Sequence, residues 1–345
     1  MQSRFLTLDA LRGVAAIGVM LFHNCIDIIK HGYLAVDLFF ALSGFIIAFS
    51  YEAKLRGGLK KSAFALARAV RFWPMIVVGS ILGLAGGLAH HLVHPENANY
   101  FTLTTQFIAS LLLIPDFLAP EQDELFPLNT VFWSLFYEVL VNGIYGFWLY
   151  TQRSQPFLIC LIVIAAIYLL FGPELKAVSL FCRAFVGFFA GVLTYRIFQQ
   201  SNPRTFPYGW LFCVIVICTV LAFPISFKPS GALFLLVVVI FCTVVFCAAS
   251  SDRGMPKPVA RCSQWLGEIS YPLYAVHRPL FYFCSVVIVR LTSGMFAYNI
   301  AALVASAFIV VAADLVLRFY DQPIRATLHR LIKSRMSLSS RPQTT

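Results

Sequence analysis

Residues 8–29 read LDALRGVAAIGVMLFHNCIDII, an apolar run with only a few ionisable side chains. A helix of roughly 20 such residues crosses the hydrocarbon core of a bilayer. Further long apolar runs follow at 34–52, 72–92, 129–149, 155–171, 178–195, 207–224, 231–250, 268–289 and 297–317. The pattern predicts an all-α, polytopic integral membrane protein with about ten transmembrane helices.

The composition excludes the other broad classes of protein. Of the 345 residues, 60% are hydrophobic and 12% are charged, whereas soluble domains have about 25% charged residues. A soluble enzyme or a disordered chain is therefore excluded. A transmembrane β-barrel would show short alternating segments instead of long apolar runs. The nine cysteines include no Cys-x-x-Cys pair, which favours free thiols over a metal or disulfide framework.

The basic residues predict how the chain is oriented. With the N-terminus in the cytoplasm and ten spans, 19 of the 26 Lys and Arg lie on the cytoplasmic side and four on the outer side. This split also explains the net charge of +11 without nucleic acid as a partner. Counting the short run 103–114 as a span would place the basic ends on opposite faces. We therefore expect both termini in the cytoplasm and a multi-pass protein of the inner (plasma) membrane.

The domain organisation follows from this arrangement. Residues 1–333 form a single transmembrane domain, and residues 334–345 form a disordered cytoplasmic tail that is rich in Ser and Thr. The longest segment between spans is the outer loop 93–128. Its apolar run 103–114 is too short to span and is typical of a re-entrant or interfacial segment.

Arg12 and His23 are the first candidate pair for chemistry. They are 11 residues apart, which places them within about 20° of the same helix face and roughly 16 Å apart along the axis. Histidine is suited to general base catalysis near neutral pH. Asp27 follows one turn later and is a candidate to orient the imidazole. The alternative is an arginine that reaches the interface and a histidine bonded to a carbonyl group.

Arg68 and Arg71 precede the third span at its predicted cytoplasmic end. At a spacing of three residues they project in similar directions and are able to bind a phosphate in bidentate fashion. The alternative is ordinary anchoring of the span by basic residues.

Glu138 follows Trp133 by five residues and lies inside the fourth predicted span. A carboxylate at that depth requires an arginine, His23 or a proton as its partner. A purely structural ion pair is the alternative. In the second span, Asp37 and Ser43 are candidates to line a polar cavity.

Two other groups of histidines are weaker candidates. His277 lies in the ninth predicted span, where a lone histidine is usually a packing residue. His90 and His94 have a spacing that permits metal binding, but the surrounding sequence does not favour it, and we expect no metal.

Five motifs in order resemble acyltransferase family 3, the multi-span membrane O-acyltransferases that modify bacterial surface glycans. They are Leu8-Asp-Ala-Leu-Arg-Gly13 leading to His23, Gly32-Tyr-Leu-Ala-Val-Asp37 leading to Ser43-Gly44-Phe45, Arg68-x-x-Arg71, Trp133-Ser134 with Glu138, and Leu266-Gly267 leading to Tyr271, Tyr274 and His277. The resemblance extends from residue 5 to Asp321-Gln-Pro323. Asp321 stands where the family usually has glutamate, and Ala10 where it often has glycine.

The resemblance implies an acyl-CoA donor, usually acetyl-CoA, used from the cytoplasmic side, with no permanently bound cofactor. The acceptor is a hydroxyl of a polysaccharide, a lipid-linked sugar or a glycoside, and the overall likeness is to exopolysaccharide-modifying members. The expected roles form three groups: His23, Arg12 and Glu138 are catalytic; Arg68, Arg71 and Arg12 bind the donor; Asp37, Ser43, Trp133, Tyr271 and His277 contact the substrate.

Direct transfer of the acyl group and an acyl-histidine intermediate both remain open. So do two functions of another class, a secondary transporter of a sugar or anion and a non-catalytic subunit of a polysaccharide export system. The sequence does not define the oligomeric state.

Overall fold

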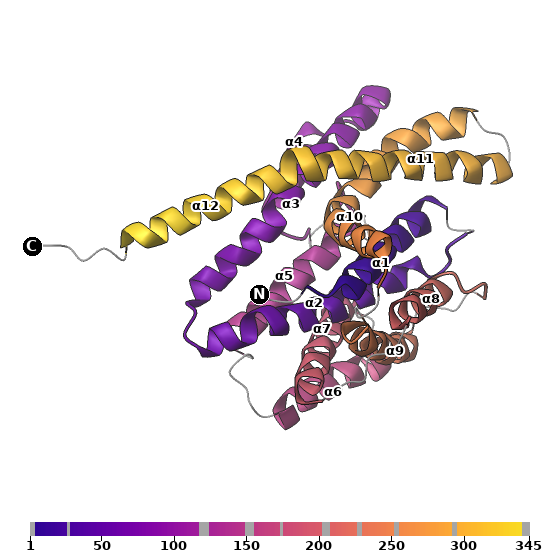
Figure 1. Cartoon of the computed structure of the whole chain (residues 1–345). Coiled ribbons are helices and arrows are strands. Elements are labelled where there is room, and N and C mark those ends of the chain that lie inside the picture. Colours follow the sequence, from indigo (N-terminus) through magenta and orange to yellow (C-terminus); the bar gives the residue numbers. More distant parts are fainter. Residues whose placement is uncertain are drawn as a thin grey trace, which may run out of the picture.

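The computed structural model describes residues 4–25, 28–116, 124–148, 155–172, 175–201, 208–225, 230–251, 255–291 and 295–339, and its secondary structure in these ranges is helical (Figure 1). The longer helices are α1 (Leu6–Asn24), α2 (Ala35–Arg56), α3 (Lys61–Val93), α7 (Lys176–Gln200), α9 (Gly231–Ala249), α10 (Lys257–Leu291) and α11 (Met295–Val316). The shorter ones are α4 (Tyr100–Leu111), α5 (Phe132–Phe147), α6 (Gln155–Phe171), α8 (Gly209–Leu221) and α12 (Gln322–Ser339). Single turns lie at η1 (Gly32–Leu34), η2 (Pro95–Asn97) and η4 (Leu317–Asp321).

The helices confirm a polytopic membrane protein. In the described ranges, seven helical stretches are long and apolar enough to cross a bilayer, and α6 and α8 are apolar but shorter. Helix α5, at the predicted fourth span, has only 16 residues. The count of ten spans and the cytoplasmic placement of both termini therefore stay predictions.

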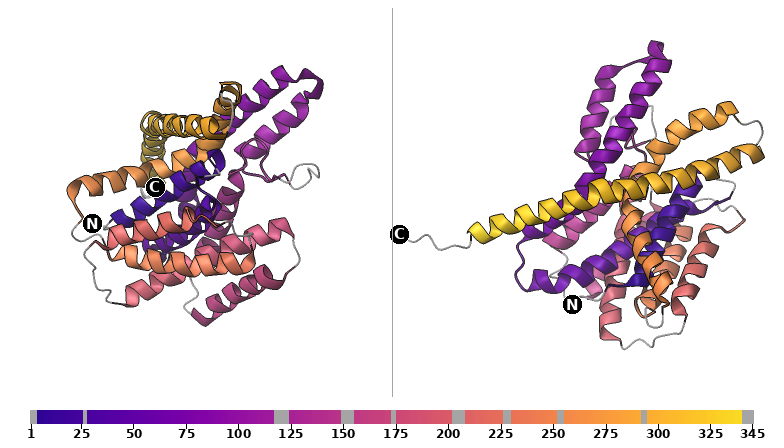
Figure 2. Two further views of the ribbon diagram at one scale, coloured as in Figure 1. Left: turned by 90° about the vertical axis from the view of Figure 1, so that its right-hand side faces the viewer. Right: turned by 45° about the horizontal axis from the view of Figure 1, so that its top comes forward.

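In its described residues, the segment between the third and fourth predicted spans contains the single turn η2 and the short helix α4, of 12 residues. It lies beside the second half of α3, and the two extend away from the other helices (Figure 2). The contact is close because Gly87 of α3 faces Leu103, whose side chain occupies the space where a Cβ atom would be. At the other end of the chain, α12 continues to Ser339, past the predicted boundary at Lys333, and forms one rod with α11 (Figure 1).

Helix α1 lies inside the bundle and contacts α2, α8 and α10 (Figure 1). Its backbone approaches α10 closely at two glycines. A Cβ atom on Gly13 would lie 2.4 Å from the Cβ of Leu266, and one on Gly267 would lie 2.6 Å from the Cβ of Asp9. Small residues permit such contacts between membrane helices, where dispersion replaces the hydrophobic effect. The contact fixes α1 against α10, the two helices that carry His23 and His277.

Helices α2 and α7 are joined by two buried ion pairs. Arg183 donates to both carboxylate oxygens of Asp37, at 2.7 and 2.6 Å. Near the other end of α2, Glu52 accepts from Arg196 at 3.2 Å and from the hydroxyl of Tyr145 at 3.0 Å. Each pair offsets the cost of a charge placed in an apolar interior.

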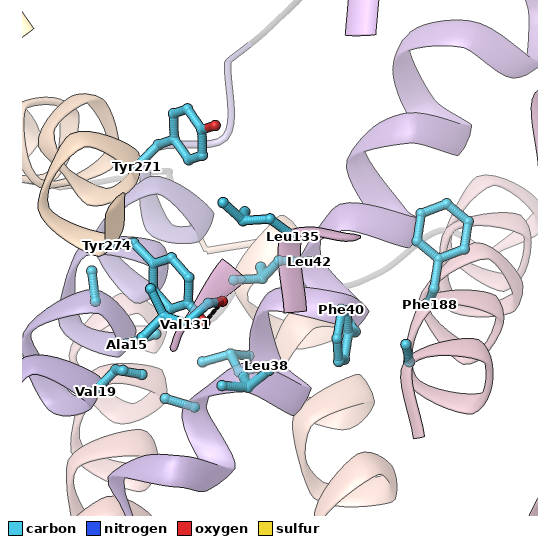
Figure 3. Close-up of a cluster of buried hydrophobic side chains, with 14 of the residues drawn as sticks. Ala15, Val19, Leu38, Phe40, Leu42, Val131, Leu135, Phe188, Tyr271 and Tyr274 are labelled. Atoms are coloured by element: carbon cyan, nitrogen blue, oxygen red, sulfur yellow. Dashed lines mark hydrogen bonds between the residues drawn. The ribbon is translucent and has the colours of Figure 1, made fainter. Parts of the chain in front are cut away.

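Apolar side chains fill the space between these polar contacts. Figure 3 shows part of this cluster, in which Leu38 and Leu42 of α2 pack near Val131 and Leu135. On the opposite side of α2, Phe40 lies against α7, 2.9 Å from the position of a Cβ atom on Gly187. Helix α2 is therefore buried on several faces, consistent with a central position in the bundle.

The predicted orientation is testable with single cysteines in a variant that lacks the nine native ones. A cysteine at Asn97 should react with an impermeant thiol reagent added to intact cells. Cysteines at Gly58 and Lys257 should react only after permeabilisation, because they precede spans on the basic side. Labelling from outside at Gln122 but not at Asn97 would show that α4 crosses the membrane and that the count of ten spans is wrong.

Candidate active site

A cavity of about 370 Å³ lies at the end of the bundle where α1 and α3 begin, and we call it the arginine cavity. Its charged lining residues are Arg4, Arg12, Arg68, Arg71, Arg325, Asp9, Glu138 and Glu268. They come from the start of α1, from α3, α5, α10 and α12, and from the segment just before α1. Five cations face three carboxylates, so the cavity favours an anionic ligand.

The arginines of α3 are held by aromatic rings and not by acids. The guanidinium of Arg68 lies 4.8 Å from the ring centre of Phe72, and that of Arg71 lies 5.3 Å from the ring of Tyr271. Tyr271 is fixed in turn by donating to the backbone oxygen of Phe72 at 2.6 Å. No described carboxylate lies within ion-pair distance of Arg68 or Arg71, and the buried Nε of Arg68 has no described hydrogen-bond partner. Their donors therefore remain available to a ligand.

Most of the carboxylates of the cavity are already bound by neighbouring groups. Asp9 pairs with Arg4 and lies 3.5 Å from Arg12, and Glu268 lies 3.0 Å from Arg4. Glu138 accepts from the hydroxyl of Ser43 at 2.6 Å. These contacts keep the acids at fixed places in the wall, so the cations of α3 face the open space.

A second cavity, of about 460 Å³, lies toward the opposite ends of α1 and α3, and we call it the histidine cavity. His23, His90, Arg278, Asn129, Tyr282 and Tyr298 are among its lining residues. It shares no described lining residue with the arginine cavity. In the described ranges no cluster of three His, Cys, Asp or Glu side chains is arranged to hold a metal.

The imidazoles of His23 and His277 are hydrogen-bonded to each other, with Nδ1 of His23 3.0 Å from Nε2 of His277. Nδ1 of His277 lies 2.8 Å from the backbone oxygen of Tyr274, and because a carbonyl only accepts, this nitrogen holds the proton. In neutral His277 the Nε2 atom is then an acceptor, so Nδ1 of His23 is the donor. This chain leaves Nε2 of His23 unprotonated, which is the state required of a general base.

Tyr274 lies between the two cavities. Its ring lines the arginine cavity and packs at 5.8 Å from the ring of His277. Its hydroxyl group is 2.6 Å from the hydroxyl of Ser134. The same group is 3.4 Å from the backbone oxygen of Val131, a residue drawn beside it in Figure 3. These contacts hold Tyr274 between the arginine cavity and the ring of His277.

The structure brings some of the predicted site residues together and separates others. Arg12, Ser43, Arg68, Arg71, Glu138 and Tyr271 all line the arginine cavity. His23 does not join them, although it shares a face of α1 with Arg12, because the two lie at different ends of the helix and open into different cavities. Glu138 is not the partner of His23; that partner is His277, for which sequence reasoning expected contact with the substrate. Asp27 lies outside the described residues.

Asp37 and Trp133 are not placed as substrate ligands. Asp37 is fully buried in its ion pair with Arg183, and the guanidinium of Arg183 lies 5.8 Å from the ring of Trp133. Neither side chain is among the lining residues of the two cavities. The pairing uses both oxygens of Asp37, so this carboxylate serves to connect α2 with α7.

Sequence reasoning missed several residues of the site. Arg325 joins the arginine cavity from α12, which follows the last predicted span, and the sequence analysis assigned it no role in the site. Arg278 and Asn129 line the histidine cavity. A signal was available for Arg278, because it is one of only three basic residues that fall inside predicted spans. Such residues are rare in spans and usually functional or paired.

Comparison with known proteins now defines the class. The chain matches the sequence profile of the acyltransferase domain family, acyltransferase family 3, over residues 5–318. It is similar to "Protein 2 in picA locus" of Rhizobium radiobacter, with 32% identity over 191 residues that cover 50% of this chain and 96% of that protein. No solved structure shows significant similarity.

The chain belongs to acyltransferase family 3, and the resemblance drawn from its five motifs is confirmed. It is therefore a membrane acyltransferase. Family membership favours an enzyme over the transporter and export-subunit alternatives.

The structural role of Asp37 is testable with paired substitutions. Asp37→Leu and Arg183→Leu should each lower the amount of folded protein, because each leaves one buried charge without its partner at a cost of roughly 3–5 kcal/mol. The double Leu variant should recover much of this loss. Thermal stability in detergent, followed by size-exclusion chromatography, measures the effect. A double variant that folds but no longer binds the acceptor would show that Asp37 belongs to the substrate site.

Proposed function

We propose that the protein transfers an acyl group, usually acetyl, from cytoplasmic acyl-CoA to a hydroxyl group of a glycan, a lipid-linked sugar or a glycoside. The donor binds in the arginine cavity and the acceptor in the histidine cavity. The observation that supports this most directly is a chain of contacts from one cavity to the other: Tyr274 lines the arginine cavity and packs on His277, and His277 is bonded to His23, which lines the histidine cavity. One cavity is rich in cations and the other exposes a histidine suited to act as a base.

The arginine cavity suits coenzyme A. The phosphates of coenzyme A cannot enter hydrocarbon, and the free guanidinium donors of Arg68 and Arg71 are placed to bind them at the end of the bundle. The pantetheine arm is thin and flexible. The rise between Arg12 and His23 is roughly 16 Å, a distance of the same order as that arm. The thioester thus reaches the histidine pair while the nucleotide stays outside the membrane.

The chemical step needs a base because a sugar hydroxyl is a weak nucleophile at neutral pH. The hydroxyl oxygen attacks the thioester carbonyl carbon, and its proton passes to Nε2 of His23. The carbon–sulfur bond then breaks, the ester remains on the sugar, and the proton from His23 goes to the departing thiolate of coenzyme A. Throughout, Nδ1 of His23 stays bonded to His277, which keeps the imidazole oriented.

In this proposal the side chain of Tyr274 forms the wall between the two cavities, and this wall must open for the reaction. The contacts of Tyr274 with Ser134 and Val131 are single hydrogen bonds, and each is worth about 1 kcal/mol. We infer that entry of the acyl group displaces the Tyr274 hydroxyl group from Ser134. Once it is displaced, the ring of Tyr274 no longer separates the thioester from His23.

The test of this function uses membranes that contain the chain, radiolabelled acetyl-CoA and a glycan extract. Label should appear in the glycan with the wild type and not with His23→Gln, which keeps hydrogen bonding but removes the base. Binding of acetyl-CoA should remain in the variant, because His23 lies outside the arginine cavity. Turnover by His23→Gln at the wild-type rate would exclude His23 as the base. Label bound covalently to the protein without acceptor would instead establish an acyl-enzyme.

The role of the α3 arginines predicts a different kinetic effect. Arg68→Ala and Arg71→Ala should each raise the KM for acyl-CoA by roughly tenfold or more, since a charge-assisted hydrogen bond contributes about 1.5–3 kcal/mol. Lysine at either position should restore binding only in part. Dialysis with labelled acyl-CoA measures affinity without turnover. A double Ala variant with unchanged affinity would remove these residues from the donor site.

A further inference from the structure

Among the described residues that line the histidine cavity, Arg278 is the one permanent cation and none is acidic. Arg278 follows His277 on α10, and its Nε lies 3.2 Å from the hydroxyl oxygen of Thr130. No described carboxylate lies within ion-pair distance of Arg278, and none of the described side chains that line this cavity is acidic. By contrast, the other arginines inside predicted spans, Arg12 and Arg183, each lie near an aspartate.

An arginine without a counter-ion is costly at membrane depth unless it faces water or a ligand. The guanidinium group offers five N–H donors, of which the contact with Thr130 uses one. The remaining donors suit a planar carboxylate or a phosphate, which they bind in bidentate fashion. Within the described residues, the cavity therefore offers Arg278 no negatively charged partner, and a ligand is able to supply one.

The side chain of Asn129 is a second polar group of this cavity that a ligand would satisfy. Asn129 is 1% exposed and lines the same cavity. Its Nδ2 donates to the backbone oxygen of Ala275 at 2.9 Å, which fixes the orientation of the amide. Its Oδ1 is buried without a described hydrogen-bond partner. A buried acceptor of this kind costs free energy unless a donor such as a sugar hydroxyl reaches it.

The size and walls of the cavity fit a sugar. Its volume of about 460 Å³ lies inside the range of roughly 300–1,000 Å³ that is typical of ligand sites. The rings of Tyr282 and Tyr298 contribute to its lining and give apolar surface for the face of a pyranose. His23, whose Nε2 is the base, lines the same space.

We propose that the histidine cavity binds an acidic sugar, one that bears a carboxylate or a phosphate, and that Arg278 pairs with this group while Asn129 accepts from a hydroxyl. The proposal rests on the proposed function for the place of the acceptor and adds the chemical class of that acceptor. Arg278 is in this view a residue that determines specificity. It selects sugars by charge and takes no proton during the reaction.

The alternative role for Arg278 is stabilisation of negative charge on the thioester oxygen during transfer. That role predicts loss of turnover with every acceptor, charged or neutral. Pairing with an acidic sugar predicts a loss of affinity that is confined to acidic sugars. Binding measured without acyl-CoA separates the two roles, because no thioester is then present.

The experiment uses the full chain in detergent and equilibrium dialysis with three radiolabelled probes, methyl glucuronide, glucose 1-phosphate and methyl glucoside. We expect at least one of the acidic probes to bind about tenfold or more tightly than the neutral glucoside. Arg278→Gln should lower that affinity by roughly tenfold to a hundredfold, as for loss of a charge-assisted contact, and change glucoside binding less than about twofold. The two acidic probes show whether a carboxylate or a phosphate is the preferred group.

The matched control is Arg318→Gln. It also removes one arginine, but Arg318 pairs with Asp314 and is 60% exposed, outside both cavities. This variant should bind all three probes as the wild type does. Size-exclusion chromatography shows whether each variant is folded. If Arg278→Gln does not fold, Arg278→Lys replaces it in the test, and because it keeps the charge it should retain part of the affinity for the acidic probe.

The inference would be overturned by equal binding of the neutral and acidic probes by the wild type, or by equal loss of affinity for both kinds of probe in the Arg278 variants. Failure of both acidic probes to bind would do the same. Failure of the proposed function gives a different pattern, in which an acidic sugar binds selectively but labelled acetyl-CoA transfers nothing to glycan. The two outcomes are therefore distinguishable.

Discussion

An unpaired charge is expensive in the interior of a membrane protein, and this constraint explains where the ionisable side chains of this chain lie. Asp37 with Arg183 and Glu52 with Arg196 satisfy it inside the protein, and they join α2 to α7 at two levels. The arginines of α3 and Arg278 have no such ion pair among the described residues. They line cavities instead. The helices connected by the paired charges form the rigid frame, and the unbalanced charges mark the two places where ligands are expected.

Much of the fold could be predicted from the sequence because apolar runs of about 20 residues have few alternatives to a transmembrane helix. Each predicted run contains a helix, and the short run 103–114 overlaps one of only 12 residues. Helix ends were less predictable. Helices α3 and α10 extend well beyond their apolar parts, since polar residues such as Lys61 continue a helix outside the apolar core without a penalty. Helix α12 likewise continues past Lys333.

The candidate site was predictable where its residues are neighbours in sequence and not where tertiary packing decides. Arg68 and Arg71 line the same cavity because they are about one turn apart on α3. The spacing of Arg12 and His23 places them on one face of α1. Whether they open into one cavity or two depends on the neighbouring helices, which the spacing does not define. The partner of His23 comes from α10, 254 residues away, and the partner of Asp37 comes from α7, 146 residues away. Spacing within one helix contains no information about either contact.

If the donor is acyl-CoA, as in the proposed function, the separation of the two cavities also protects its thioester from water. A histidine that is free to accept a proton would activate water as readily as a sugar hydroxyl, so acyl-CoA beside an open histidine cavity would be hydrolysed. In the proposed function, the contacts of Tyr274 with Ser134 and Val131 separate the thioester from His23 until both substrates are bound. Because these are few and weak bonds, the binding free energy of the correct substrates is sufficient to open the wall. A stronger wall would slow transfer with the correct acceptor, and a weaker one would allow hydrolysis. The modest hydrogen bonding at Tyr274 is therefore suited to an enzyme that must bring two substrates together from opposite ends of one helix.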